Sequence, residues 1–164
     1  MPPADSFVHL HTHTAYSLSE GAIPASKLAA LAAQLGMPAV AMTDSSNLFG
    51  ALEFSDYAAK KGVQPIMGCQ LALTRLTMDP DRPDAGRLTP DPIVALAMNE
   101  EGYANLQTLS SHSFLRDDPS GRPAITLDLL REHAGGLFLL TGGTLGPVAR
   151  LLGDGRRDAA KRLL

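Results

Sequence analysis

The stretch Ala39-Val40-Ala41-Met42-Thr43-Asp44 decides the fold that this sequence predicts. It is a short, continuous apolar run, which is typical of a parallel strand whose two faces are covered by helices. A second helix is expected after this strand, with Asn47 as its cap and Gly62 as its end. Before the strand, a helical pattern runs from Pro24 to Gly36, with an apolar stripe formed by Leu28, Leu31, Ala32 and Leu35.

The same alternation of strands and helices continues outward in both directions. Strands are predicted at residues 7–11, 63–69, 93–97 and 137–141, and helices at residues 103–113 and 126–133. Residues 77–92 and 114–123 are predicted to be exposed loops. This order predicts an α/β fold in which helices cover parallel strands joined by right-handed crossovers. About five strands are too few for a closed eight-stranded barrel, so we expect a partial βα barrel or an open sheet.

The composition is that of an ordinary globular chain. Its 164 residues are 45% hydrophobic and carry a net charge of -3, so we expect a single domain over residues 1–164 without a basic surface for nucleic acid. Cys69 is the only cysteine, which excludes an intramolecular disulfide and favours a reducing compartment. The first residues show no signal-peptide pattern, and no apolar run reaches membrane-spanning length. These features predict a cytoplasmic protein with no membrane partner.

Histidines cluster close to the start of the chain. His9, His11 and His13 alternate along the first predicted strand, and side chains two residues apart in a strand share a face. Imidazole is the commonest metal ligand among protein side chains. The pair His11 and His13 lies, with Asp44 and Gly142, where predicted strands run into loops, which is where βα folds carry their functional sites. This pattern predicts metal chemistry at that end of the strands.

Several spaced motifs resemble a known family. Residues 7–14 and 16–21 resemble the opening of the PHP (polymerase and histidinol phosphatase) domain. Residues 35–44, 47–50 and 62–68 resemble, more narrowly, the N-terminal PHP domains of bacterial DNA polymerase III alpha subunits, and residues 102–106 and 139–143 agree in order. The resemblance implies a distorted βα barrel that is longer than this chain. It therefore supports a C-terminally truncated fragment, as does the uncapped helical pattern at residues 155–164; a natural terminal helix is the alternative.

The resemblance also implies a metal cluster at the barrel mouth in active members. His11 and His13 match the first ligand pair, and Glu20 matches the early acidic ligand. Other ligand positions depart from the pattern, because the family's His, Glu, His and Cys are replaced by Ser45, Gln70, Pro92 and Gly143. The final Asp-x-His motif would lie beyond Leu164.

These departures remove most of the expected ligands, because serine and glutamine are weak ligands for transition metals and the side chains of proline and glycine are none. A two-metal hydrolytic site needs more donors than His11, His13 and Glu20 supply. The three could hold one zinc or manganese ion at a vestigial site, since two imidazoles and a carboxylate form a known ligand set. The alternative is a site without metal in which these side chains hydrogen-bond one another. We assign no catalytic and no cofactor-binding residue.

The function implied is that of a structural and interaction domain. The rest of a polymerase chain would be its covalent partner, and the proofreading exonuclease subunit would dock on it. The parent would be a DNA-directed DNA polymerase, which is a nucleotidyltransferase. This domain would contact DNA only through that parent polymerase. The enzymatic alternative is a metal-dependent PHP phosphoesterase or 3′–5′ exonuclease, and a third possibility is a small standalone PHP-like protein. Outside this site, Cys69 is expected to be a core residue and His133 to stabilise a helix C-terminus.

Overall fold

The computed structural model describes residues 7–75, 89–115 and 122–164. The predicted loops at 77–92 and 114–123 lie mostly outside these residues. In chain order the helices and strands are α1 (Ala25–Gln34), β1 (Ala39–Met42), α2 (Ala51–Lys60), β2 (Gln64–Leu73), β3 (Asp91–Ala97), α3 (Glu100–Leu115), α4 (Leu127–Glu132), β4 (Leu137–Leu140), a 3-10 turn (Gly143–Leu145), α5 (Pro147–Gly153) and α6 (Arg157–Leu163). The class is α/β, as predicted, with β1 at the stretch that decides it.

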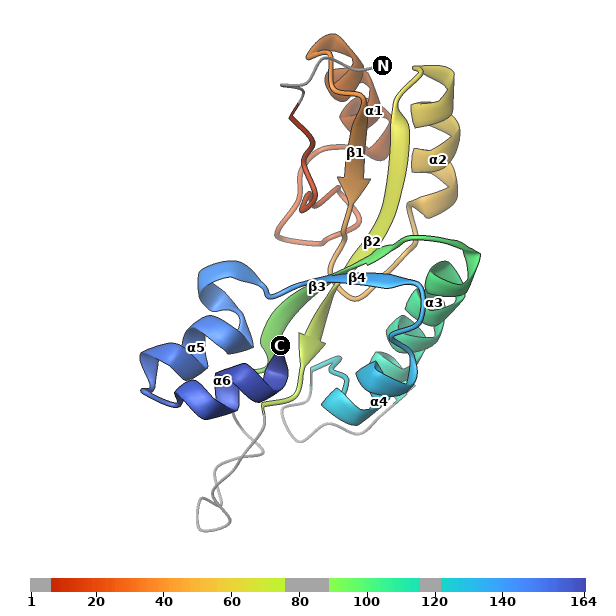
Figure 1. Ribbon diagram of the computed structural model, residues 1–164. Coiled ribbons are helices and arrows are strands. Elements are labelled where there is room, and N and C mark those ends of the chain that lie inside the picture. The colour runs from red at the N-terminus through yellow and green to blue at the C-terminus, as the bar shows by residue number, and fades with distance from the viewer. Residues whose placement is uncertain (1–6, 76–88, 116–121) are drawn as a thin grey trace.

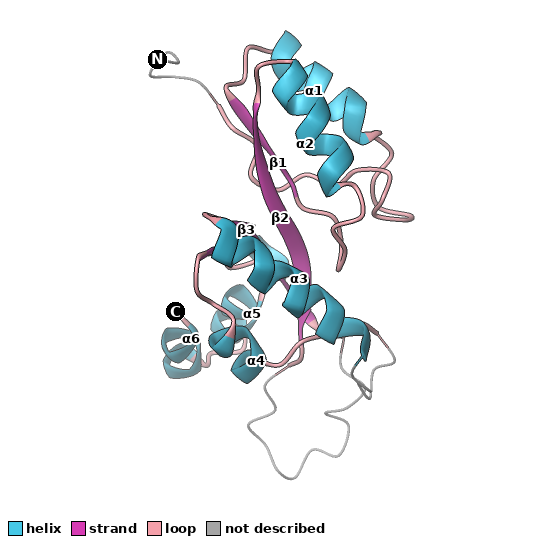
Figure 2. Cartoon of the chain, turned by 90° about the vertical axis from the view of Figure 1, so that its right-hand side faces the viewer, coloured by secondary structure: helices cyan, strands magenta, loops and turns pink. Residues whose placement is uncertain are grey.

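The long strand β2 joins two parts of the molecule (Figure 1). Its first residues pair in parallel with β1, from Gln64 beside Ala39 to Met67 beside Met42. Its later residues, from Gly68 onward, pair antiparallel with β3, which pairs antiparallel with β4. The sheet order is therefore β1-β2-β3-β4. Helices α1 and α2 flank the part of the sheet that contains β1, and α3 and α4 flank the part that contains β3 (Figure 2).

The expectation that all strands are parallel is wrong for β3, which pairs antiparallel with both β2 and β4. A single helix, α2, connects β1 to β2, and one crossover returns the chain in the same direction. Two helices, α3 and α4, lie between β3 and β4, and β4 runs antiparallel to β3 and therefore in the same direction as β1 and β2. Strand direction depends on how many times the connection reverses, which the apolar pattern of a short strand does not encode.

The predicted first strand is not a regular strand in the structure. Residues 9–12 lie beside β1, where the amide of Ala41 donates to the His9 carbonyl (2.8 Å) and the amide of Thr43 donates to the Thr12 carbonyl (2.9 Å). The return bond comes from the Thr12 amide, which donates to the Thr43 hydroxyl at 2.8 Å rather than to a backbone carbonyl. A side chain thus takes the place of one rung of the ladder, and regular pairing is interrupted.

Two apolar cores lie along β2. The first joins α1, α2 and β1 and centres on Phe54, Met42 and Val40. The second joins α3 and α4 to β2 and β3 and includes Cys69, Leu71, Leu106, Leu109 and Ile125. Since β2 contributes to both cores, burial on either side holds this strand in place.

Several local predictions are confirmed and others are corrected. Thr126 caps α4 by accepting a hydrogen bond from the Leu129 amide. Gly36 and Gly62 follow α1 and α2 with left-handed φ angles of 67° and 69°. The cap residue of α2 is Gly50, because Asn47 instead accepts from the Phe49 amide in a turn before the helix.

The apolar stripe predicted for α1 is only half buried. Leu28 and Ala32 are buried, but Leu31 and Leu35 are exposed, and the small residues Ala25 and Ala29 complete the buried face. The strand predicted at 137–141 is likewise not fully buried. In β4, Phe138 is 52% exposed and Leu139 is 41% exposed, because this strand forms the edge of the described sheet. No helix among the described residues is both long and apolar enough to cross a bilayer.

Gly68 offers a test of how tightly the two ladders meet. A Cβ added there would lie 2.6 Å from Leu96 Cδ2 and 2.8 Å from both the Ala95 carbonyl oxygen and Thr43 Cγ2. We expect Gly68→Ala to lower the free energy of unfolding by about 1–3 kcal/mol, because a backbone atom must move to make room. Urea denaturation measures this change.

Gly153→Ala is the matched control, since a Cβ at Gly153 meets nothing within 4 Å. Its unfolding midpoint should stay within experimental error of the parent or rise slightly, because alanine favours helix more than glycine does. Equal effects at the two positions would contradict close packing at Gly68.

Candidate functional site

The site lies where the chain leaving β1 passes beside β2. Ser45 forms a parallel bridge with Gln70. The Gln70 amide donates to the Asp44 carbonyl (3.1 Å), and the Ser46 amide donates to the Gln70 carbonyl (2.8 Å). These backbone bonds place the Ser45 and Gln70 side chains next to each other. From the sequence, both residues are predicted only as substitutes for lost metal ligands.

Asp44 anchors the loop that carries the remaining site residues. Its carboxylate is fully buried and accepts hydrogen bonds from the Thr14 amide (2.7 Å), the Thr14 hydroxyl (2.7 Å) and the Ser17 hydroxyl (2.5 Å). The Ser17 oxygen in turn accepts from the Ser45 amide at 3.0 Å. Charge-assisted bonds of this kind are the strong ones. They fasten residues 14–17 to the end of β1 and so position His13 and Glu20 on either side of the loop.

Five polar side chains close into a ring at this point: His11, His13, Glu20, Ser45 and Gln70. His11 Nε2 lies 2.8 Å from Gln70 Oε1 and 3.2 Å from His13 Nε2. His13 Nδ1 lies 3.0 Å from Glu20 Oε2. The Ser45 hydroxyl donates to the same Glu20 oxygen (2.5 Å) and accepts from Gln70 Nε2 (3.2 Å). We call this arrangement the polar ring.

The donors and acceptors of the polar ring match throughout. Gln70 donates a hydrogen bond to the Ser45 hydroxyl, and that hydroxyl donates one to the Glu20 carboxylate. His13 donates from Nδ1 to Glu20, which leaves its Nε2 as an acceptor. The Nε2 proton of His11 lies between that acceptor and the Gln70 oxygen. The network thereby assigns a different tautomer to each imidazole, and each side-chain contact in the ring joins a donor to an acceptor.

The three proposed ligands lie together, but their donor atoms do not all converge: His11 Nε2 and His13 Nε2 are 3.2 Å apart, whereas the Glu20 carboxylate is on the other side of the His13 ring. Glu20 contacts Nδ1 of His13 and His11 contacts Nε2 of the same ring, and these nitrogens face different directions. His11 Nε2 also carries the proton that faces Gln70, so it offers no lone pair. Within the described parts of the chain, no group of three or more His, Cys, Asp or Glu side chains is arranged to hold a metal ion. Binding of one zinc or manganese ion by His11, His13 and Glu20 stays a prediction.

A cleft of about 300 Å³ lies beside the polar ring. Glu20, Ser45, Gln70 and Pro92 contribute to its lining, with Arg122 farther along. Pro92, one of the substituted ligand positions, thus lines the same cleft as Ser45 and Gln70. Gly143, the fourth substituted position, belongs to the 3-10 turn and is not among the described residues that line the cleft.

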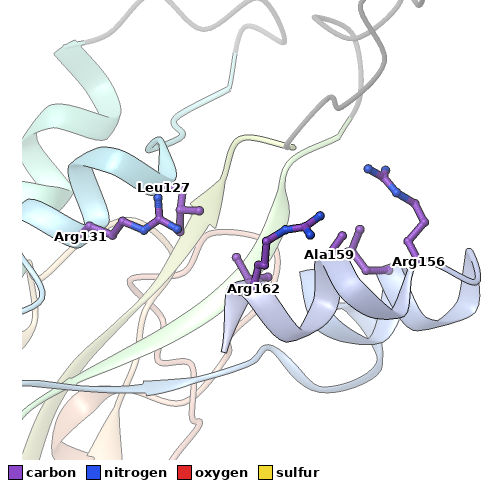
Figure 3. Close-up of a pocket in the computed structure, with 7 residues that line it drawn as sticks. Leu127, Arg131, Arg156, Ala159 and Arg162 are labelled. Atoms are coloured by element: carbon purple, nitrogen blue, oxygen red, sulfur yellow. The ribbon is translucent and has the colours of Figure 1, made fainter.

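A second pocket, of about 140 Å³, lies apart from the cleft between α4 and the helices α5 and α6. Figure 3 shows Arg131, Arg156 and Arg162 around it, and its floor is apolar, with Leu127 and Leu151 contributing. It shares no lining residue with the cleft beside the polar ring.

Asp91 is a buried acid that sequence reasoning missed. It is 2% exposed and accepts from the Arg150 guanidinium, with Arg150 Nη2 2.6 Å from Asp91 Oδ2, and from Arg75 Nε at 3.2 Å. The hydrogen bonds to Asp91 raise the pKa of Arg150. Because Asp91 and Arg150 are 59 residues apart in the sequence, no local sequence pattern predicts this ion pair. The pair ties α5 to the start of β3, next to Pro92.

Other predicted roles can be compared with the structure. Cys69 is fully buried in the second core, and its thiol donates to the Asp44 carbonyl at 3.3 Å, so the prediction of a core cysteine is confirmed. His133 follows α4 directly, and its Nδ1 lies 3.2 Å from Asn105 Oδ1. His9 is exposed, and its ring meets the Phe7 ring edge-on.

Comparisons with known proteins identify the family to which this chain is similar. The family model described as "PHP domain" matches residues 9–164. The chain is 44% identical over 158 residues to the DNA polymerase III subunit alpha of Caulobacter vibrioides, covering 96% of this chain and 14% of that protein. It is 39% identical over 157 residues to that of Treponema pallidum, covering 95% and 13%. The chain thus spans about one seventh of the length of these relatives.

Among solved structures, an amidohydrolase from Chromobacterium violaceum matches with a TM-score of 0.45 and 24% identity. The match covers 64% of this chain and 34% of the amidohydrolase.

Removal of the Asp44 carboxylate tests its role as the anchor. Asp44→Ala leaves the donors of Thr14 and Ser17 without their acceptor, so we expect the free energy of unfolding to fall by about 3–5 kcal/mol. The control is Asp56→Ala, since Asp56 is exposed and pairs only with Lys60 on the helix surface. That change should cost about 0.5 kcal/mol or less. Similar losses for both variants, measured by urea denaturation, would contradict the anchor.

The reactivity of the Cys69 thiol tests whether this part of the core stays closed. Burial disfavours the thiolate and raises the pKa of Cys69 to about 12, so the group stays protonated at about pH 8. We expect iodoacetamide to leave Cys69 unmodified in the folded protein and to alkylate it fully in denaturant, as measured by mass spectrometry. Rapid alkylation of the folded protein would show that this part of the core opens.

Proposed function

Because this chain belongs to the PHP domain family, we propose that it is the PHP domain of a bacterial replicative DNA polymerase, the DNA polymerase III alpha subunit, and that it acts there as a structural and interaction domain without catalysis of its own. The observation that carries the second half of this proposal is the polar ring. In this ring, the imidazole nitrogens of His11 and His13 and the carboxylate of Glu20 hydrogen-bond to other side chains. A hydrolytic metal site would require these same atoms as ligands.

The relatives support the polymerase context. Two DNA polymerase III alpha subunits align over nearly the whole chain, at 44% and 39% identity, while the chain covers 14% and 13% of their lengths. The remainder of the polymerase is then the covalent partner of this domain, and nucleotidyl transfer takes place in that remainder. DNA is contacted through the parent protein, in keeping with a net charge of -3 on this chain. Such a replication protein works in the cytoplasm.

The chemistry of the site supports the loss of hydrolysis. Two-metal catalysis needs anionic and imidazole donors that surround both ions. At this site a hydroxyl and a carboxamide, from Ser45 and Gln70, point at one another and at Glu20 and His11. Neither group brings negative charge to bind a cation. A polymerase with such a domain needs proofreading from elsewhere, so we propose that the separate exonuclease subunit docks on this domain.

The enzymatic alternative is a metal-dependent phosphoesterase or intrinsic 3′–5′ exonuclease. It is favoured by one observation: His11, His13 and Glu20 do lie together, beside a cleft of about 300 Å³. Rearrangement of the imidazoles would be needed before their lone pairs could face a common ion.

The deciding experiment measures 3′–5′ exonuclease activity on single-stranded DNA, with manganese and with zinc. It compares the unsubstituted full-length protein with its His11→Ala variant. We expect no metal-dependent activity above that of a heat-inactivated sample, and no difference between parent and variant. Activity that disappears with His11→Ala would refute the non-catalytic role and support the alternative.

Metal analysis provides the companion measurement. Protein purified without a histidine tag should contain well below one zinc or manganese per chain, before and after incubation with either ion. Ser45→His combined with Gln70→Glu restores the ligand types that the family pattern has at these positions, and it should raise the bound metal if the backbone around the site keeps its geometry.

A further inference from the structure

We propose that the polar ring is a metal-independent clasp in which Gln70 and Ser45 act as a pair to hold the loop of residues 14–21 against the sheet. The proposal rests on the part of the proposed function in which this site works without a metal, and it assigns a task to the two residues that break the ligand pattern. The clasp is one side-chain network that joins β2, the end of β1 and the loop.

The position of Gln70 is set by the backbone. Its amide donates to the Asp44 carbonyl and its carbonyl accepts from the Ser46 amide, so the residue is held at both sides. Its side chain then uses both ends of the carboxamide: Oε1 accepts from His11 at 2.8 Å and Nε2 donates to Ser45 at 3.2 Å. A residue that can only accept, or only donate, would break one of these two links.

Ser45 completes the link from Gln70 to the loop. Its hydroxyl accepts from Gln70 and donates its single proton to Glu20 at 2.5 Å. A glutamate at position 70 could not donate to Ser45, and it would bring a second carboxylate close to Glu20 without a cation between them. Gln70 and Ser45 are therefore chemically complementary: each supplies what the other needs for the ring to close.

The side chain of Glu20 fastens the loop in addition to its backbone bonds, among which the Ala15 amide donates to the Ile23 carbonyl at 2.9 Å. Asp44 holds its beginning through Thr14 and Ser17, but Glu20 lies beyond these contacts. Ser19 adopts a left-handed φ of 68°, which is costly for a residue other than glycine. A Cβ at Gly21 would lie 2.1 Å from the Thr14 carbonyl oxygen, so the two ends of the loop are in close contact. The bonds of Glu20 to His13 and Ser45 hold the strained turn closed.

Hydrogen exchange measured by mass spectrometry on the full-length protein tests the clasp. In Gln70→Met, which keeps the length of the side chain but removes both hydrogen bonds, the amides of Glu20 and Gly21 should exchange about tenfold faster. These amides donate to the Ser17 carbonyl and report whether the turn is closed. Peptides from α1 should exchange at the parent rate, which shows that the variant is folded.

Gln64→Met is the matched control, because Gln64 lies on the same strand and its side chain bonds the neighbouring Pro65 carbonyl at 3.2 Å, outside the polar ring. It should leave the exchange of the loop unchanged. Ser45→Ala should speed exchange as Gln70→Met does, and the double variant should add little to either single change, since both remove the same network. Unchanged exchange in Gln70→Met and Ser45→Ala, or full additivity in the double variant, would overturn the clasp.

Addition of EDTA separates the two proposals. The parent protein should exchange at the same rate with and without the chelator. Faster loop exchange in EDTA would mean that a metal holds the loop, and it would overturn both the clasp and the metal-free function. If the loop exchanges slowly both in the presence of EDTA and in the Gln70→Met variant, the clasp alone is overturned and the proposed function stands.

Discussion

The rest of the structure depends on the short segment of β2 that is paired on both edges. Gly68, Cys69 and Gln70 lie between the chain leaving β1 on one side and β3 on the other. Before this segment β2 pairs with β1 and after it with β3, and each ladder has its own helices and its own core. The absence of a side chain at Gly68 lets Thr43, Ala95 and Leu96 approach, and this approach brings the two halves together. The polar ring is built on the last residue of the same segment.

Local patterns predicted those parts of the structure that local sequence controls. The apolar run at 39–43 became β1, Thr126 caps α4, and Gly36 ends α1 in a left-handed conformation. The direction of β3 was missed because direction depends on the path of the whole connection. The burial of α1 was misjudged because Leu31 and Leu35 satisfy the helical period but lie outside the contact with α2, which small alanines line.

The site was predictable in its membership but not in its bonding. The resemblance singled out His11, His13, Glu20, Ser45 and Gln70, and the structure brings all of them into one network. The resemblance treated Ser45 and Gln70 only as lost ligands, since their mutual hydrogen bond joins residues 25 positions apart. Asp44 could have been noticed as an acid at the end of a buried apolar run, because a buried carboxylate must find donors. The Asp91 and Arg150 pair had no such signal.

The chemistry of the ring explains why a site of this kind changes at more than one position. A cluster of carboxylates and imidazoles is held together by the cations it binds, and without them its like charges repel. Conversion of one glutamate to glutamine removes a charge but leaves an amide with two donors and an acceptor to satisfy. Gln70 meets this demand through His11 on one side and Ser45 on the other. A histidine at position 45 would lack the compact hydroxyl that accepts from Gln70 and donates to Glu20 at once. Under the proposed clasp, the two departures are one change, in which matched hydrogen bonds take over the cohesion that metal charge supplies in a cluster of carboxylates and imidazoles.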